Sequence, residues 1–156
     1  MQIQELLNAD TVVVGLPAGD KETVIAELVQ LFDGNPAVKD LNALKTAVLE
    51  RERVMSTGVG KGLALPHAKT SAVTDTVAAL AVTDADVDFE SLDGSPVRIL
   101  FLLVGTPEAK SHHVRILSRI SRLMNKDIVR EKLLTAQAPD ELMTILESSE
   151  KQLLDR

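Results

Sequence analysis

The chain has 156 residues, 45% hydrophobic and 26% charged, which is typical of one globular domain with a sizeable core. Its formal net charge of −6 argues against a nucleic-acid partner, and three Phe residues as the only aromatic residues offer little for base stacking. The absence of cysteine excludes disulfides, thiolate nucleophiles and Cys-ligated zinc, and three histidines are too few for a His-only closed metal site.

No segment indicates secretion or membrane insertion. The first residues lack the basic and apolar regions of a signal peptide, and the longest apolar run, residues 99–104, is too short to span a bilayer. No Ser-, Pro- or charge-rich linker interrupts the chain. We therefore expect a cytoplasmic, acidic protein with a single domain over residues 1–156.

The first fifty residues predict one strand followed by two helices. A β-branched run at residues 11–14 predicts the strand. Asp20 is placed to cap a helix over residues 21–32, in which apolar residues recur at helical spacing. Asp40 is placed to cap the second helix, which ends in the charged cluster 50–53 (ERER).

The segment 58–69 (GVGKGLALPHAK) carries the first candidate for chemistry. Its three alternating glycines predict a flexible connection at a sheet edge, with backbone N–H groups free to face an anion. The spacing matches neither a Walker A loop nor a dinucleotide-binding fingerprint. Residues 63–65 (LAL) predict a buried strand that Pro66 ends, so we expect His67 where the sheet stops and a loop begins.

The remainder of the chain predicts two strands and then three helices. The strands lie at residues 76–82 and 97–104, and the second is apolar almost throughout, so it is expected to be covered on both faces. The helices begin near residues 107, 127 and 139. Strands mixed with helices predict the α/β class, with a central mixed sheet flanked by helices in an α/β/α sandwich.

Two adjacent histidines in the first of these helices point about 100° apart. Apolar residues follow His113 at i+3, i+4 and i+7, so His113 faces the core, whereas arginines follow His112, which lies on the polar face. An inward histidine is more often a satisfied core residue than a functional one. The apolar stripe predicted for this helix comprises Val114, Ile116, Leu117, Ile120, Leu123 and Met124.

The charged cluster 50–53 permits two interpretations. It is a solvated turn with cations near a helix C-terminus, or Arg51 and Arg53 clamp a phosphate or carboxylate near His67. Together with a second imidazole and the glycine N–H groups, the second interpretation fits phosphoryl chemistry on a histidine. One ring nitrogen attacks, and the other groups stabilise the phosphoryl oxygens.

Three segments, 49–52 (LERE), 56–60 (STGVG) and 62–67 (GLALPH), resemble the signature of EIIA domains of the phosphotransferase system. The resemblance is to the fructose/mannitol class, which includes the nitrogen-regulatory EIIA proteins. The segment 108–117 (EAKSHHVRIL) resembles the part of this family that carries a second histidine. The order of elements is similar over nearly the whole chain, which implies the type-2 EIIA fold.

The resemblance implies a phosphotransferase that acts as a phosphocarrier in sugar uptake of the fructose/mannitol type. His67 would accept a phosphoryl group at Nε2 from the phosphohistidine of HPr, or an HPr-like protein, and pass it to a cysteine of an EIIB partner. Arg51 falls at the family's phosphate-stabilising arginine. His113 falls at the second histidine, which hydrogen-bonds the phosphoryl oxygens. Neither a metal nor another cofactor is implied on this domain.

The resemblance leaves more than one role open. A transport component would pass phosphate through EIIB to a sugar permease. A regulator of the nitrogen-regulatory type would instead use the phosphorylation state of His67 to control binding to a partner protein. A relic with only a structural role is a third alternative, which the joint presence of Arg51, His67 and His113 disfavours. The sugar, the partners and a homodimeric state are not decided by the sequence.

Donor and acceptor proteins must both reach the histidine, so an exposed apolar rim is expected around it. Its candidate members are Val59, Leu63, Leu65 and Ala68. Ala68 also stands where members of the family often have glycine, which implies a tighter or differently shaped turn. Lys61 adds a positive charge within the glycine segment, where it assists a phosphate or is solvated.

Overall fold

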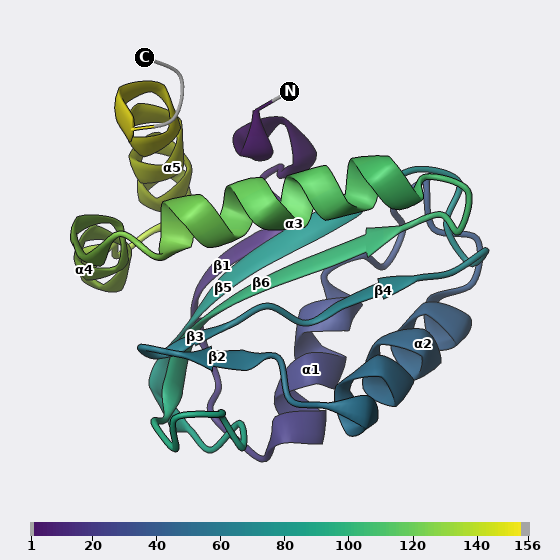
Figure 1. Ribbon diagram of the computed structural model, residues 1–156, viewed down its shortest axis with the longest axis horizontal. Coiled ribbons are helices and arrows are strands. Elements are labelled where there is room, and N and C mark those ends of the chain that lie inside the picture. Colours follow the sequence, from purple (N-terminus) through teal and green to yellow (C-terminus); the bar gives the residue numbers. More distant parts are fainter. Residues whose placement is uncertain (1, 154–156) are drawn as a thin grey trace.

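The computed structural model describes residues 2–153 and contains a six-stranded mixed sheet between two layers of helices (Figure 1). The strands are β1 (Val12–Leu16), β2 (Gly58–Gly60), β3 (Leu63–Ala64), β4 (His67–Lys69), β5 (Val77–Val87) and β6 (Val97–Gly105). The sheet order is β1-β5-β6-β3-β2, and β4 pairs with the same edge of β6 as β3. Parallel and antiparallel pairs both occur, so the predicted central mixed sheet is confirmed.

Helices make up the two outer layers. They are α1 (Lys21–Gln30), α2 (Leu41–Val54), α3 (Lys110–Met124), α4 (Asp127–Thr135) and α5 (Pro139–Leu153), with a short 3-10 helix, η1 (Ile3–Leu6), before β1. The longest, α3 and α5, have 15 residues each. No helix in the described part of the chain is long and apolar enough to cross a membrane.

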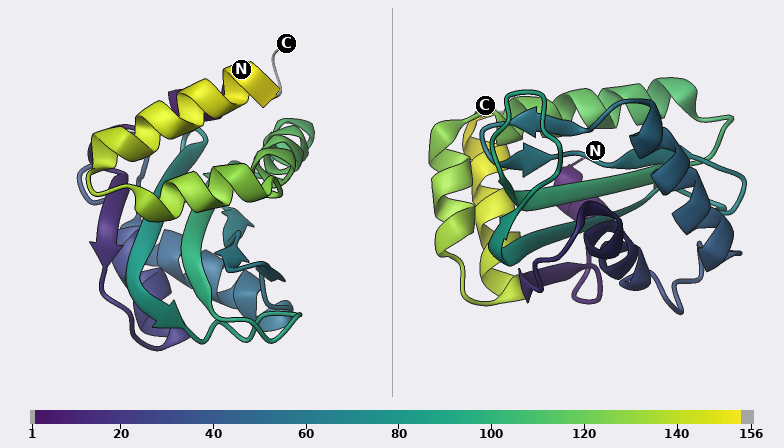
Figure 2. Two further views of the ribbon diagram at one scale, coloured as in Figure 1. Left: turned by 90° about the vertical axis from the view of Figure 1, so that its left-hand side faces the viewer. Right: turned by 90° about the horizontal axis from the view of Figure 1, so that it is seen from below.

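Each face of the sheet is covered by a different part of the chain. Helices α1 and α2 lie on one face, and η1, α3, α4 and α5 lie on the other (Figure 2). Within β6, Leu102 packs on the side of α1 and α2, whereas its neighbour Leu103 packs on the side of α3, α4 and α5. The prediction that this strand is covered on both faces is therefore confirmed, because successive side chains of a strand point to opposite faces.

Side-chain caps begin the two helices before the glycine segment, as predicted. The Oδ1 atom of Asp20 accepts a hydrogen bond from the backbone N–H of Thr23 at 2.8 Å. The Oδ1 atom of Asp40 accepts one from the N–H of Ala43 at 3.0 Å. Each carboxylate satisfies one of the amides that the first turn of a helix leaves without an intrahelical partner.

The structure differs from the predicted pattern in two elements that follow. β5 continues five residues beyond the predicted end at residue 82. This extension includes the exposed Asp84 and Asp86, and aspartate is uncommon in strands. α3 begins at Lys110 rather than near residue 107, and Val114, the residue after its first turn, is 61% exposed. Val114 therefore does not belong to the apolar stripe, although the stripe is otherwise correct.

Candidate functional site

His67 is the first residue of β4, which continues the line of β3 along β6 after a two-residue break. In the break, the N–H of Leu65 donates to the carbonyl of Thr57 at 3.0 Å, away from β6. Pairing resumes where the N–H of Leu103 donates to the carbonyl of Pro66 at 3.1 Å. The expectation that the sheet ends before His67 is wrong, because Pro66 lacks a donor but still offers an acceptor.

The ring of His67 is held by its own backbone. Its Nδ1 lies 2.8 Å from the carbonyl oxygen of Leu65, and because a carbonyl only accepts, Nδ1 carries the hydrogen and Nε2 keeps its lone pair. Burial lowers the pKa of His67 below its ordinary value. Arg51 and Lys69 lower this pKa further, while the hydrogen bond to Leu65 and the charge of Glu52 oppose the shift. At neutral pH, His67 therefore presents a neutral ring with a free Nε2.

His113, in the first turn of α3, faces His67, with the ring centroids 5.9 Å apart and the ring planes inclined by 48°. Its side chain is 3% exposed, and neither of its nitrogens has a hydrogen-bond partner among residues 2–153. Burial lowers the pKa of His113 to about 4, helped by the charges of His67, Lys69 and His112. A buried polar atom without a partner costs about 1–3 kcal/mol, which suits a group that awaits a ligand.

Gly105 at the end of β6 gives the ring of His113 its space. A Cβ atom at this position would lie 2.9 Å from Nδ1 of His113. Gly105 is also the partner of Lys69 in β4, so the strand pair that positions His67 leaves room for the second ring. Sequence reasoning did not single out Gly105, because only the folded chain brings it to His113.

Of the two arginines in the charged cluster, only Arg51 acts on His67. Helix α2 packs against β4, and Arg51 in its last turn lowers the pKa of His67 through its charge. Its Nη1 donates to the carbonyl of Met55 at 3.0 Å. Arg53 points elsewhere and pairs with Glu22 of α1 at 3.3 Å. The two arginines therefore do not form a common clamp.

Glu52 was missed by the sequence analysis, which gave it no role of its own within the charged cluster 50–53. Its side chain is 4% exposed and forms an ion pair with Lys21 of α1, with Nζ and Oε2 2.8 Å apart. It also accepts hydrogen bonds from the backbone N–H and the hydroxyl of Thr57. The alternating charges gave no sign of this burial, since it depends on a turn that folds Thr57 back onto α2.

The glycine segment forms a short hairpin of β2 and β3 instead of an open anion loop. The N–H of Gly58 donates to the hydroxyl of Ser56 at 3.1 Å, and the N–H of Lys61 donates to the carboxylate of Asp93 at 3.1 Å. The side chain of Lys61 reaches Asn125 after α3, where Nζ lies 3.1 Å from Oδ1. These amides and this cation are thus occupied away from His67.

The expected apolar rim is wrong in three of its four members. Leu63, Leu65 and Ala68 are buried, because β3 and β4 lie within the sheet and pack into the two cores, and only Val59 is exposed. The exposed apolar side chains on the elements that carry the site are Val54, Met55, Val59 and Val114. Val54 is the last residue of α2, Met55 directly follows it, and Val114 directly follows His113 in the sequence.

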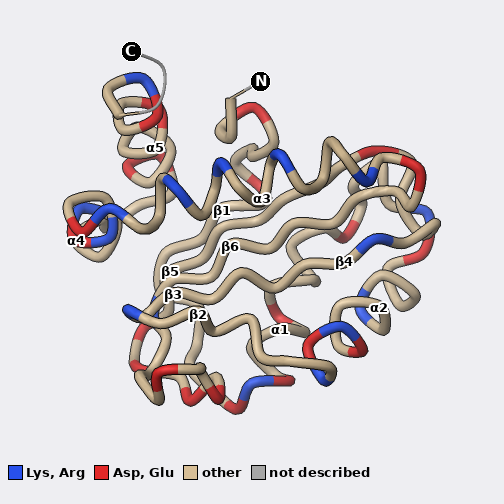
Figure 3. Tube along the Cα trace, in the orientation of Figure 1, with Lys and Arg blue, Asp and Glu red and all other residues tan. Residues whose placement is uncertain are grey.

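Charges are distributed unevenly over the chain (Figure 3). Helix α3 contains Lys and Arg residues but no acidic residue, whereas residues 84–93 contain five acidic residues. The cations that act on the histidine pair are Arg51 of α2 and Lys69 of β4, a setting that favours an anion beside the pair. Within residues 2–153, no group of three His, Asp or Glu side chains is arranged to hold a metal ion.

Comparison with known proteins finds relatives over nearly the whole chain. Residues 5–149 match the family described as phosphoenolpyruvate-dependent sugar phosphotransferase system, EIIA 2. The chain is 38% identical over 151 residues to the fructose-specific EIIABC component of Bacillus subtilis, covering 97% of this chain and 24% of that protein. The chain thus spans about a quarter of that relative.

Two further relatives are matched over most of their own length. A fructose-specific EIIA component of Haloferax volcanii is 37% identical over 130 residues, which cover 83% of this chain and 84% of the relative. A nitrogen regulatory protein of Pseudomonas aeruginosa is 30% identical over 146 residues, which cover 94% of this chain and 95% of the relative.

Solved structures agree with the fold. The crystal structure of the nitrogen regulatory protein IIA-Ntr from Neisseria meningitidis has a TM-score of 0.86 and 28% identity, covering 92% of this chain and 98% of that one. The mannitol enzyme IIA of Escherichia coli, solved in complex with phosphorylated enzyme IIB, has a TM-score of 0.78 and covers 91% and 97%. At 19% identity, the second likeness concerns the fold alone.

Proposed function

The chain belongs to the EIIA 2 family of the phosphoenolpyruvate-dependent sugar phosphotransferase system, and we propose that it carries a phosphoryl group on His67. The observation that supports this most directly is the histidine pair. His67 is oriented through Nδ1 with Nε2 free, and the facing His113 is neutral, buried and without a hydrogen-bond partner in the described chain. A nucleophile and a neighbouring donor are thereby held close together.

In the first step, Nε2 of His67 attacks the phosphorus of a phosphohistidine on HPr or an HPr-like donor. The new N–P bond forms as the donor's N–P bond breaks, and the donor ring keeps the electron pair. The carbonyl of Leu65, which accepts from Nδ1–H, stabilises the positive charge that develops on the ring. Arg51 and His113 would donate to the phosphoryl oxygens, because phosphoryl transfer needs mainly positioning and charge stabilisation.

In the second step, a cysteine thiolate of an EIIB partner attacks the same phosphorus. The S–P bond forms as the N–P bond to His67 breaks, and the ring returns to its neutral state. The name of the Bacillus subtilis relative combines A, B and C components, and the E. coli mannitol enzyme IIA was solved with phosphorylated IIB. Both support an EIIB partner for this chain. Since the donor pathway starts from phosphoenolpyruvate, the proposal places the reaction in the cytoplasm.

Sugar uptake of the fructose/mannitol type is the first candidate for the role, and regulation is the second. The two fructose-specific relatives are 38% and 37% identical, against 30% for the nitrogen regulatory protein. The regulatory alternative is favoured by coverage, because that relative and the Neisseria IIA-Ntr structure both match over nearly their full length. The chemistry at His67 is the same in both roles.

The phosphocarrier proposal is tested by intact mass. The protein is incubated with phosphoenolpyruvate, Enzyme I and HPr, and the wild type is compared with His67→Ala. We expect one acid-labile phosphoryl group in the wild type and none in the variant. No gain in the wild type with HPr from several sources would overturn transport and point to a dedicated donor.

The two roles are then separated by the fate of the phosphoryl group. Phosphorylated protein is mixed with a purified fructose-type EIIB, and both masses are followed over time. Loss from His67 with an equal gain on EIIB supports transport. A group that stays on His67, together with a partner that binds only one phosphorylation state, supports regulation.

A further inference from the structure

We propose that Glu52 and Thr57, supported by Lys21, are positioning residues that hold Arg51 beside His67. The inference rests on the proposed role of Arg51 in the phosphocarrier reaction. The three residues form a buried clamp at the end of α2, and this clamp fixes the turn to which the guanidinium of Arg51 is bound. None of the three needs to touch the phosphoryl group.

The clamp begins with the way α2 ends. Helix α2 stops at Val54, and Met55 takes an extended conformation, with φ −163° and ψ 136°, so the chain leaves the helix axis abruptly. The carboxylate of Glu52 then accepts two hydrogen bonds from Thr57, one from its backbone N–H at 2.7 Å and one from its hydroxyl. Two hydrogen bonds to one carboxylate fix the path of the turn between Met55 and Thr57.

The turn between Met55 and Thr57 also holds Arg51. Nη1 of Arg51 donates to the carbonyl of Met55 at 3.0 Å, and Met55 is the residue at which the chain reverses. The guanidinium is therefore anchored to a carbonyl whose position the Glu52–Thr57 pair determines. If that pair were lost, the Met55 carbonyl would no longer be fixed, and Arg51 would lose its anchor.

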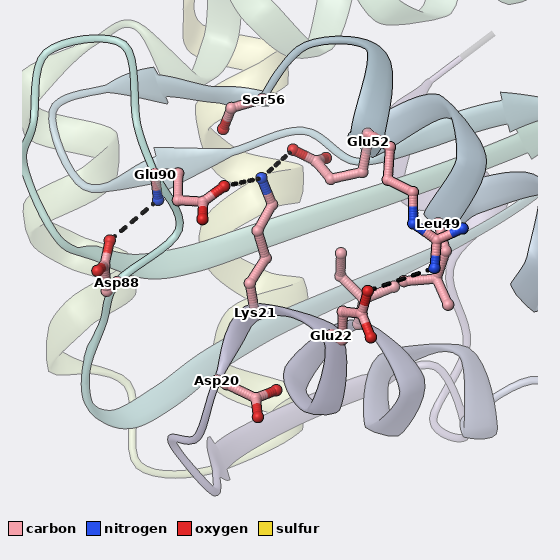
Figure 4. Close-up of a pocket in the computed structure, with 10 residues that line it drawn as sticks. Asp20, Lys21, Glu22, Leu49, Glu52, Ser56, Asp88 and Glu90 are labelled. Atoms are coloured by element: carbon pink, nitrogen blue, oxygen red, sulfur yellow. Dashed lines mark hydrogen bonds and ion pairs between the residues drawn. The ribbon is translucent and has the colours of Figure 1, made fainter.

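Lys21 supplies the counter-charge that stabilises the buried carboxylate of Glu52. Its Nζ lies 2.8 Å from Glu52 and 3.7 Å from Glu90 (Figure 4). The same Nζ lies 4.8 Å from the centre of the Phe89 ring. A carboxylate that is taken out of water needs a counter-charge and hydrogen bonds to its oxygens. Glu52 has both, which suits a rigid support better than a surface salt bridge would.

Charge and position can be separated, because several charged groups act on His67. Arg51 and Glu52 of α2 and Lys69 of β4 act on its pKa through their charges. Replacing Glu52 would remove a charge that itself raises the pKa of His67. Replacing Thr57 by valine removes the hydroxyl bond of the clamp and leaves the backbone N–H bond and all of these charges in place, so Thr57 is the better position to change.

The experiment compares Thr57→Val with Thr57→Ser, each in the wild type and in the Arg51→Ala background. Valine keeps the volume but removes the hydroxyl, whereas serine keeps the hydroxyl and serves as the conservative control. Thr57→Ala replaces the valine variant should valine prevent folding. The two readouts are the pKa of His67 from an NMR titration and the rate of phosphoryl acceptance from phospho-HPr.

We expect Thr57→Val to raise the pKa of His67, because the Arg51 cation that lowers it is no longer held in place. Phosphoryl acceptance should slow about tenfold, since a displaced charge stabilises the transition state poorly. Thr57→Ser should match the wild type in both readouts. In the Arg51→Ala background, Thr57→Val should change neither quantity further.

Two outcomes would overturn the inference. One is an unchanged His67 pKa and rate in Thr57→Val, which would show that Arg51 needs no clamp. The other is an equal loss in the Arg51→Ala background, which would show that Thr57 acts through general structure. If the wild type accepts no phosphoryl group, the proposed function fails, but the titration still decides whether Thr57 positions Arg51.

Discussion

The rings of His67 and His113 face each other with their centroids 5.9 Å apart, and they differ in hydrogen bonding. The Leu65 carbonyl engages Nδ1 of His67, which leaves a defined tautomer with Nε2 free. Neither nitrogen of His113 has a partner in the described part of the chain. This asymmetry supports the proposal that the tethered ring is the nucleophile and that the unpaired one hydrogen-bonds the phosphoryl group.

The first prediction concerns this pair. His67→Ala should abolish acceptance of the phosphoryl group, because His113 lacks the backbone tether that orients a nucleophilic nitrogen. His113→Ala should still be phosphorylated on His67, about a hundredfold more slowly, which is the usual cost of losing one transition-state hydrogen-bond donor. Quenched-flow samples analysed by intact mass give both rates. Phosphorylation of the His67→Ala protein at another histidine would contradict the assignment.

His112 provides a matched control for His113. It is adjacent in the sequence but only partly buried, and it lies away from the apolar side of α3. We expect His112→Ala to change the rate of phosphoryl acceptance less than about twofold, because surface substitutions rarely affect a site they do not contact. Impairment by His112→Ala, with His113→Ala unaffected, would reverse the roles of the two residues.

Helical spacing was sufficient to predict that His113 is the inward residue, because burial on a helix follows a fixed period. The fate of Glu52 could not be predicted in this way, since its burial depends on Thr57 folding back after the helix ends. The continuation of the sheet at His67 escaped prediction for a related reason. Pro66 breaks a ladder locally, and only the neighbouring strand decides whether pairing resumes.

A pH dependence of stability follows from His113. Its pKa in the folded protein is lowered to about 4, below the ordinary value of 6.5, so the unfolded chain binds the proton more readily. Stability should therefore be fully present above pH 6.5 and fall as the pH drops toward 4, by about 3 kcal/mol if the whole shift is realised. The pKa of His67 is also lowered and acts in the same direction. Urea unfolding at closely spaced pH values measures the slope.

His113→Leu should remove part of this slope and stabilise the protein at pH 7. The leucine fills a similar buried space without two polar atoms that lack partners in the described chain, and removing such a penalty is worth about 1–3 kcal/mol. The same variant should slow phosphoryl acceptance as His113→Ala does. A leucine variant that is less stable than the wild type at pH 7 would show that His113 is satisfied in solution.

The last prediction uses the two ends of α2. Asp40→Ala removes the hydrogen bond to the N–H of Ala43 at the start of the helix and should cost about 1 kcal/mol of unfolding free energy. It should leave phosphoryl acceptance unchanged, because the site contacts only the other end of α2.

Arg51→Ala should do the reverse and slow acceptance about a hundredfold, since a cation beside the phosphoryl oxygens is lost. The stability of this variant should change by about 1 kcal/mol or less, because the hydrogen bond from Arg51 to the carbonyl of Met55 is exposed to solvent. Chemical denaturation and the phosphoryl-transfer rate, measured on both variants, check the pair. Slower transfer in Asp40→Ala would mean that the site depends on the whole helix rather than on the clamp at its end.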